Sequence, residues 1–146
     1  MAFRIFVDSD VLLDFTLKRS AYSIVRRLME WAINGRVQVF VSSGTLRDVG
    51  TELRKAYGAE KAQELLLALL ASVQVIDAGY DTTVNALQSR IDNIAGAISY
   101  YTALQHRLDY FITCDTSLLG VVNPVLPVTT PIEFLNRHAQ PAKRIS

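Results

Sequence analysis

The sequence has little cysteine and almost no net charge. Its single cysteine, Cys114, cannot form an internal disulfide, so a reducing compartment, the cytoplasm, is the expected location. No partner in the sequence marks Cys114 as a nucleophile, and we expect it to be a small buried residue. The 15 basic residues nearly balance the 14 acidic ones, for a net charge of +1. This balance excludes a strongly basic coat, so any nucleic-acid contact must come from a local patch.

Long hydrophobic runs are also lacking. The apolar stretch near the N-terminus ends after a few residues at Asp8, which is too short for the core of a signal peptide. The leucine-rich run 65–70 is flanked by Lys61 and Glu64, which favours a packed helix over a membrane span. We therefore expect no membrane association.

The length and composition favour one globular domain. The chain has 146 residues, of which 50% are hydrophobic and 20% are charged, an ordinary balance for a domain with a substantial core. Short β-rich runs alternate with helical stretches. This alternation predicts an α/β fold with three layers, α/β/α, around a mostly parallel sheet of about five short strands. We predict a single domain over residues 1–138 and a polar C-terminal tail over 139–146.

The elements can be placed from periodicity, caps and turn residues. Ser20 is expected to cap a helix that Asn34-Gly35 closes, and Thr130-Pro131 to open the last helix, through residue 135. The strands are predicted at 4–7, 37–41, 73–77, 109–113 and 125–128. The other helices are predicted at 10–17, 45–57, 60–71, 82–90 and 94–105.

Three acidic residues follow predicted strands. Asp8 comes directly after the first strand, Asp48 lies early in the helix after the second, and Asp115 follows the fourth. The carboxyl ends of parallel strands meet at one edge of a sheet, where ligands bind. Mg²⁺ and Mn²⁺ prefer carboxylate oxygens, and such an ion can activate water and neutralise charge on a phosphodiester. The three acids therefore predict a divalent-metal site at this edge.

Each acid also has a structural interpretation. Asp8 could cap the helix that follows it, although Ser9 is also available for that role. Capping is at least as good an explanation for Asp10, and a structural role is the better one for Asp14. Asp115 precedes the sequence TSLL and could cap a short helix. Asp48 alone is weak evidence, because an acidic residue early in a helix is common.

Five segments, in order along nearly the whole chain, resemble the motifs of PIN domains, the metal-dependent ribonuclease fold of VapC-like toxins. They are FVDSDVLLD at 6–14, VSSGTLRDV at 41–49, AISYYTAL at 97–104, DYFITCD at 109–115 and LPVTTPIEFL at 126–135. The resemblance implies a Mg²⁺- or Mn²⁺-dependent nuclease acting on single-stranded RNA, often a toxin neutralised by a partner antitoxin. It implies Asp8 as the central metal ligand, Asp48 in place of the commoner Glu, and Asp115 as a fourth acid that binds metal through water.

The third acid of that family pattern is missing. Gly96 stands where PIN domains usually carry Asp, immediately before Ala97. Asp92 precedes Gly96 by about one helical turn, or about 5 Å, and is a candidate metal ligand if the entrance to the helix is rearranged. Asn93 is an alternative, neutral ligand. The departure supports an alternative function, a catalytically degenerate PIN domain that binds RNA or protein without cutting.

The sequence also offers candidate residues for binding RNA and for forming a homodimer. Candidate RNA-binding cations are Lys18, Arg19 and Arg47, although a solvated helix face would explain Arg47 equally well. The apolar residues Leu53, Leu66 and Leu69 could serve a homodimer or the core, and the core is favoured.

A phosphatase of the haloacid dehalogenase type is a rival interpretation, because Asp8-Ser9-Asp10 after an apolar strand resembles that family's paired aspartates. It is disfavoured because Leu12 stands where Thr or Val is expected. The chain also lacks a convincing later lysine and acidic pair, and it is short for that fold.

Overall fold

A computed structural model describes residues 2–139. The described chain forms one five-stranded sheet in the order β3-β2-β1-β4-β5, and every pair of neighbouring strands is parallel. The strands are β1 (Phe3–Val7), β2 (Val37–Val41), β3 (Val73–Val75), β4 (Tyr110–Ile112) and β5 (Val128–Thr129). The helices are α1 (Ser9–Thr16), α2 (Tyr22–Ile33), α3 (Ser43–Tyr57), α4 (Ala59–Leu70), α5 (Tyr80–Gln88), α6 (Ile94–Gln105), α7 (Thr116–Leu119) and α8 (Pro131–His138).

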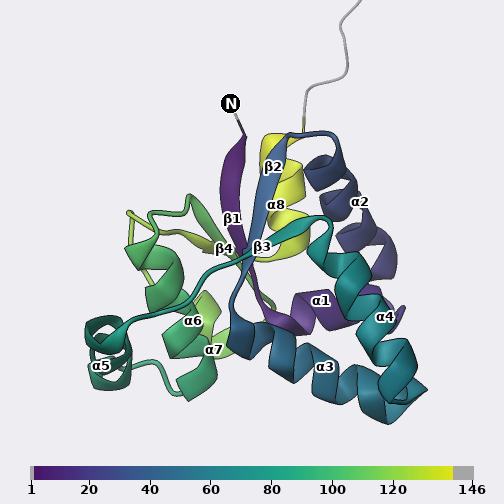
Figure 1. The fold of residues 1–146 in the computed structure, drawn as a ribbon. Coiled ribbons are helices and arrows are strands. Elements are labelled where there is room, and N and C mark those ends of the chain that lie inside the picture. Colours follow the sequence, from purple (N-terminus) through teal and green to yellow (C-terminus); the bar gives the residue numbers. More distant parts are fainter. Residues whose placement is uncertain (1, 140–146) are drawn as a thin grey trace, which may run out of the picture.

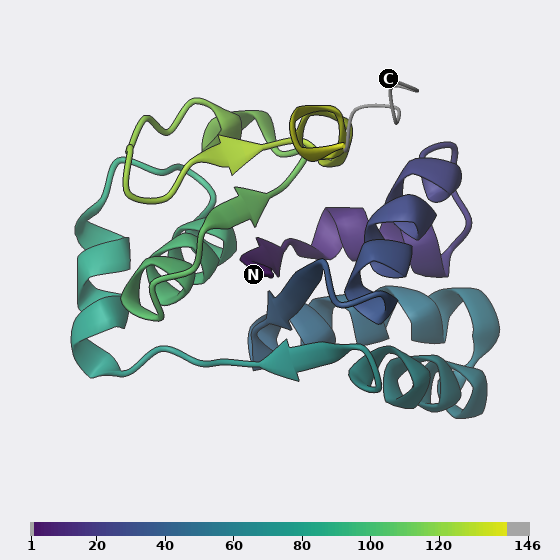
Figure 2. The ribbon, with the colours of Figure 1, turned by 90° about the horizontal axis from the view of Figure 1, so that it is seen from above.

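Helices cover both faces of the sheet, so the predicted α/β/α layering is confirmed, with a sheet that is entirely parallel (Figures 1 and 2). Successive residues of β1 point to opposite faces. Ile5 and Val7 join the core cluster that contains residues of α1, α2, α3, α4 and α8. Phe6 joins the second cluster, where it stacks on Phe111 at 5.1 Å between ring centroids and shares the core with Tyr100 of α6. The two cores fix the sheet between the helical layers.

Several predicted elements lie where the sequence placed them, and others are shifted. Strand 37–41 and helix 94–105 match β2 and α6. Helix α3 begins earlier than predicted, because the Ser42 hydroxyl accepts a hydrogen bond from the Thr45 backbone N–H at 3.1 Å and so caps the helix at its first turn. The predicted helix 82–90 lies two residues earlier, at Tyr80–Gln88.

Three local predictions were wrong. Ser20 does not cap α2; the N-cap is Ala21, without a side-chain bond, because residues 20–21 form a turn in which Tyr22 N–H bonds to the Arg19 carbonyl. The last strand begins at Val128, not at 125, because the Asn123 side chain and carbonyl close a turn over residues 123–126. Cys114 is exposed, since the chain leaves the sheet just before it.

The leucine-rich segment belongs to the amphipathic helix α4. Leu53 and Leu69 are buried in the core and Leu66 packs against it, so the core interpretation of these residues is confirmed.

Among residues 2–139, no helix has the length and apolar character needed to cross a bilayer. Of the predicted tail 139–146, all but Ala139 lies outside the described residues.

Candidate functional site

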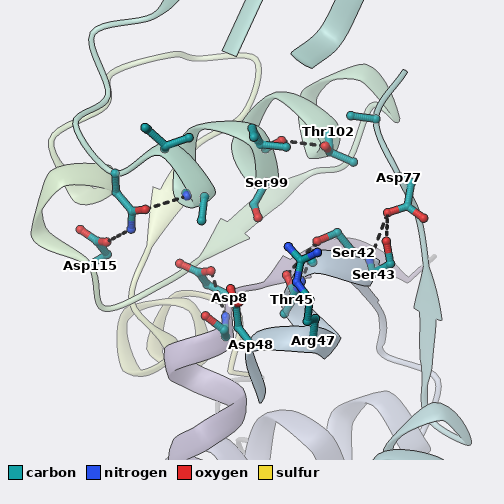
Figure 3. A pocket seen from close by; sticks show the side chains of 18 of the residues that line it. Asp8, Ser42, Ser43, Thr45, Arg47, Asp48, Asp77, Ser99, Thr102 and Asp115 are labelled. Atoms are coloured by element: carbon teal, nitrogen blue, oxygen red, sulfur yellow. Dashed lines mark hydrogen bonds between the residues drawn. The ribbon is translucent and has the colours of Figure 1, made fainter. Parts of the chain in front are cut away.

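A cavity of about 770 Å³ opens at the carboxyl edge of the sheet, where β1, β2 and β4 end and α1, α3 and α7 begin (Figure 3). The first turns of α6 form another part of its wall. Its charged lining consists of five carboxylates and one guanidinium. These are Asp8, Asp10, Asp48, Asp77, Asp115 and Arg47. The three acids singled out in the sequence thus share one cavity, as the parallel sheet predicts.

Asp8 is held at the end of β1. It is the N-cap of α1, where Oδ1 accepts a hydrogen bond from Ser9 N–H at 2.9 Å, and its Oδ2 accepts one from the Thr113 hydroxyl at 2.8 Å. The residue is 8% exposed. Burial, followed by the nearby charge of Asp10, raises the pKa of Asp8 to about 6, against the hydrogen bonds that lower it. Asp8 therefore combines the capping role with a crowded, buried carboxylate.

Asp115 also caps a helix, but in a different electrostatic setting. It is the N-cap of α7, where Oδ1 accepts hydrogen bonds from the Ser117 backbone N–H at 2.9 Å and the Ser117 hydroxyl at 2.7 Å. Its Oδ2 accepts a third bond from Asn93 Nδ2 at 2.6 Å. The hydrogen bonds from Ser117 and Asn93 lower the pKa of Asp115, because they stabilise its charged form.

Two further acids in the cavity are tied to the backbone. Asp10 accepts hydrogen bonds from Val11 N–H at 2.8 Å and from Cys114 N–H at 3.0 Å, and burial raises its pKa. Asp77, just beyond β3, accepts bonds from the backbone N–H and hydroxyl of Ser43 at 3.1 and 2.6 Å. Asp77 was not predicted as a site residue, although its place at the end of a predicted strand was a usable signal.

The remaining predicted site residues are distributed unevenly. Asp48 is an exposed residue on α3 and lines the cavity, as does Arg47. Lys18 and Arg19 do not line the cavity; both are exposed, and Arg19 lies 3.9 Å from Asp14, measured from Nη1 to Oδ1.

The structure brings Asn93, not Asp92, to the cavity. Asn93 is the N-cap of α6, with Oδ1 accepting a hydrogen bond from Gly96 N–H at 3.0 Å, whereas Asp92 is exposed and lies outside the lining. Gly96 is buried in the first turn of the helix. A Cβ there would lie 2.8 Å from Leu118 Cδ1 and 3.1 Å from Asn93 Cγ. The position of the missing third acid is therefore closed by its neighbours.

The donor set suits a hard divalent cation with few protein ligands. Every side chain of the cavity that could ligate a metal ion offers an oxygen atom, from a carboxylate, a hydroxyl or an amide. Oxygen ligands are those that Mg²⁺ and Mn²⁺ select. The charges of Asp10 and Asp115 both raise the pKa of Asp8, a crowding that a cation would relieve. Within residues 2–139, no three His, Cys, Asp or Glu side chains are placed to hold one metal ion. The site thus fits an ion bound by one or two carboxylates, with water and phosphate completing its shell.

Comparison with known proteins identifies the family. A model of the PIN domain matches residues 4–117. The chain belongs to the PIN domain family. No curated protein is a significant sequence match to it.

Solved structures with this PIN fold include toxin–antitoxin proteins. A chain of VapBC2 from Rickettsia felis, bound to a DNA fragment from their promoter, superposes with a TM-score of 0.65 at 16% identity, covering 88% of this chain and 98% of that one. A chain of a toxin–antitoxin complex from Klebsiella pneumoniae gives 0.65 at 22% identity, with coverage of 87% and 97%. The sarcin-ricin loop cleaving toxin VapC20 of Mycobacterium tuberculosis gives 0.62 at 20% identity, with coverage of 81% and 96%. These similarities establish the shared fold.

Proposed function

We propose that this PIN domain is a Mg²⁺- or Mn²⁺-dependent endoribonuclease that hydrolyses phosphodiester bonds of single-stranded RNA. The observation that carries the proposal is the cavity in which Asp8, Asp48 and Asp115 meet Arg47. A divalent ion bound there would supply a water of lowered pKa and neutralise charge on the phosphate. The combination of an acidic edge with one cation suits a substrate that arrives as an anion and is bound together with a metal.

Three residues of the cavity would have different roles, according to their surroundings. Asp8, fixed by Ser9 and Thr113, holds its carboxylate in one orientation and would be the central ligand of the ion. Asp48 is exposed and lines the cavity, and it would complete the protein's share of the ligands. Arg47 is the cavity cation and would bind the RNA phosphate through its guanidinium donors.

The test is cleavage of a fluorescent single-stranded RNA by the intact chain with Mn²⁺, Mg²⁺ or EDTA. Cleavage is expected with either ion and is lost in EDTA and in the Asp8→Asn variant, which keeps the size of the side chain and removes its charge. Asp14→Asn, outside the cavity lining, is the matched control and should cleave normally. Cleavage that persists in both EDTA and Asp8→Asn would contradict the proposal.

A second function is favoured by one observation, the closed space at Gly96. If the reduced donor set cannot support hydrolysis, the domain acts as a catalytically degenerate module that binds RNA or protein. RNA binding without cleavage in either metal, together with absence of Mn²⁺ binding, would establish this alternative.

The proposed biological setting is that of the toxin of a toxin–antitoxin pair acting in the cytoplasm. Two of the similar structures are described as a VapBC pair and a toxin–antitoxin complex, which motivates an antitoxin partner for this chain. Growth arrest on expression of the chain, relieved by the product of an adjacent gene, is the expected result.

A homodimer is a further proposal, which light scattering of the purified chain would test.

A further inference from the structure

The side chain of Asn93 makes two hydrogen bonds, one within its own helix and one to an acid of the cavity. Its Oδ1 accepts from Gly96 N–H at 3.0 Å and so caps α6. Its Nδ2 donates to Asp115 Oδ2 at 2.6 Å, the bond drawn as a dashed line at Asp115 in Figure 3. The two partners fix the orientation of the amide, because one is a donor and the other an acceptor. A single side chain therefore joins the first turn of one helix to the carboxylate that caps another.

The carboxylates of the cavity differ in how many hydrogen bonds they already accept. A carboxylate has about four lone-pair sites. Asp115 accepts three hydrogen bonds, from the Ser117 N–H, the Ser117 hydroxyl and Asn93. Asp8 accepts two, which leaves about half of its lone-pair sites free. Of the two, Asp115 is the poorer partner for a cation.

The amide of Asn93 also occupies the space that a side chain at position 96 would enter. A Cβ on Gly96 would lie 3.1 Å from both Cγ and Nδ2 of Asn93. The Asn93 amide that donates to Asp115 therefore requires that position 96 carry no side chain. In this arrangement a neutral amide donates to Asp115. A carboxylate in place of the amide would repel Asp115 unless a cation or a shared proton neutralised the pair.

We infer that Asn93 is a positioning residue that saturates Asp115 and keeps it out of direct metal coordination, so that the chain binds one divalent ion, centred on Asp8. This inference deepens the proposed function and rests on its metal site. It distinguishes Asn93 from a simple helix cap, because a cap acts only on the stability of α6.

The test is Mn²⁺ binding to the intact chain by calorimetry, supported by electron paramagnetic resonance of the bound ion. One ion per chain is expected for the wild type, with binding abolished in Asp8→Asn and changed less than about threefold in Asp115→Asn. Asn93→Asp should bind Mn²⁺ at least about tenfold more tightly, because it places a second carboxylate next to Asp115, where Asn93 Nδ2 now lies 2.6 Å away, and a bound cation relieves the repulsion between the two.

Two variants separate this effect from folding. Asn93→Asp combined with Asp115→Asn preserves a donor and an acceptor in reversed positions, and its affinity should return to that of the wild type. Asn93→Ser keeps a good N-cap but removes the amide donor, and it should bind with an affinity between those of the wild type and Asn93→Asp. Thermal melts without metal verify that each variant is folded.

The inference is overturned if the wild type binds two ions, if Asp115→Asn abolishes binding, or if Asn93→Asp leaves the affinity unchanged. Failure of the nuclease proposal has a different signature. A wild type that binds one Mn²⁺ ion, with the expected responses of the variants, but does not cleave RNA supports the inference and removes the proposed activity. Absence of binding in both the wild type and Asn93→Asp overturns both.

Discussion

The hydroxyl of Thr113 donates a 2.8 Å hydrogen bond to Asp8, and the same oxygen accepts a 3.0 Å bond from the Asp115 backbone N–H. Thr113 is fully buried at the end of β4, next to the end of β1. One threonine thus links the supports of two candidate site acids. The relationship makes Thr113 a structural determinant of the cavity although it does not line it.

Thr113→Val should lower the free energy of unfolding by about 1–3 kcal/mol, since it leaves a buried carboxylate without its side-chain donor. Thr129→Val is the matched control. Thr129 is equally buried at the end of the neighbouring strand, and its hydroxyl has no hydrogen-bond partner among the described residues, so its loss should be neutral or stabilising. Urea denaturation of the three proteins measures both effects, and equal destabilisation by the two substitutions would contradict the role given to Thr113.

Stability should fall as the pH rises from about 4 to 6. Burial and Asp10 raise the pKa of Asp8 from 3.8 to about 6, so the folded chain binds more protons than the unfolded chain in this window. The loss is on the order of 3 kcal/mol, from about two pKa units. The measurement is the difference in the free energy of unfolding between the wild type and Asp8→Asn across pH 4 to 7. The difference isolates Asp8, since the contributions of other titrating groups are common to both proteins. A difference independent of pH would refute the assignment.

Gly96→Ala should destabilise the chain by about 1 kcal/mol, since overpacking against Leu118 outweighs the gain in helix propensity. Gly120→Ala is the control, because a Cβ there meets only backbone oxygens at 3.8 Å or more. Thermal and urea denaturation would compare the two. Recovery of stability in Gly96→Ala combined with Leu118→Val would localise the strain, and a Gly96→Ala variant as stable as the wild type would argue against it.

Arg47→Gln should weaken binding of single-stranded RNA and reduce the slope of log affinity against log salt by about 0.7, the value for one phosphate contact. Arg19→Gln is the control, because Arg19 lies outside the cavity lining and near Asp14. Fluorescence anisotropy with Asp8→Asn as the background prevents cleavage during the titration. A larger effect at Arg19 than at Arg47 would move the RNA path away from the cavity.

The sequence sufficed for the parallel sheet and for the meeting of Asp8, Asp48 and Asp115, because strand ends in such a sheet share an edge. It did not suffice for the choice between Asp92 and Asn93. That choice depends on which residue caps α6, and the two differ by one position, within the uncertainty of a predicted helix start. Asp77 was missed because its role is a contact with Ser43, 34 residues away in the chain.

The close fit of Leu118 against Gly96 limits which side chains position 96 can accept. Leu118 is fully buried, and any side chain at position 96 must displace it or the Asn93 amide. A single replacement of Gly96 by Asp would therefore meet a steric penalty before it could add a ligand. Introduction of an acid at position 96 requires a compensating change at Leu118 or Asn93 first, so the order in which such substitutions are made matters.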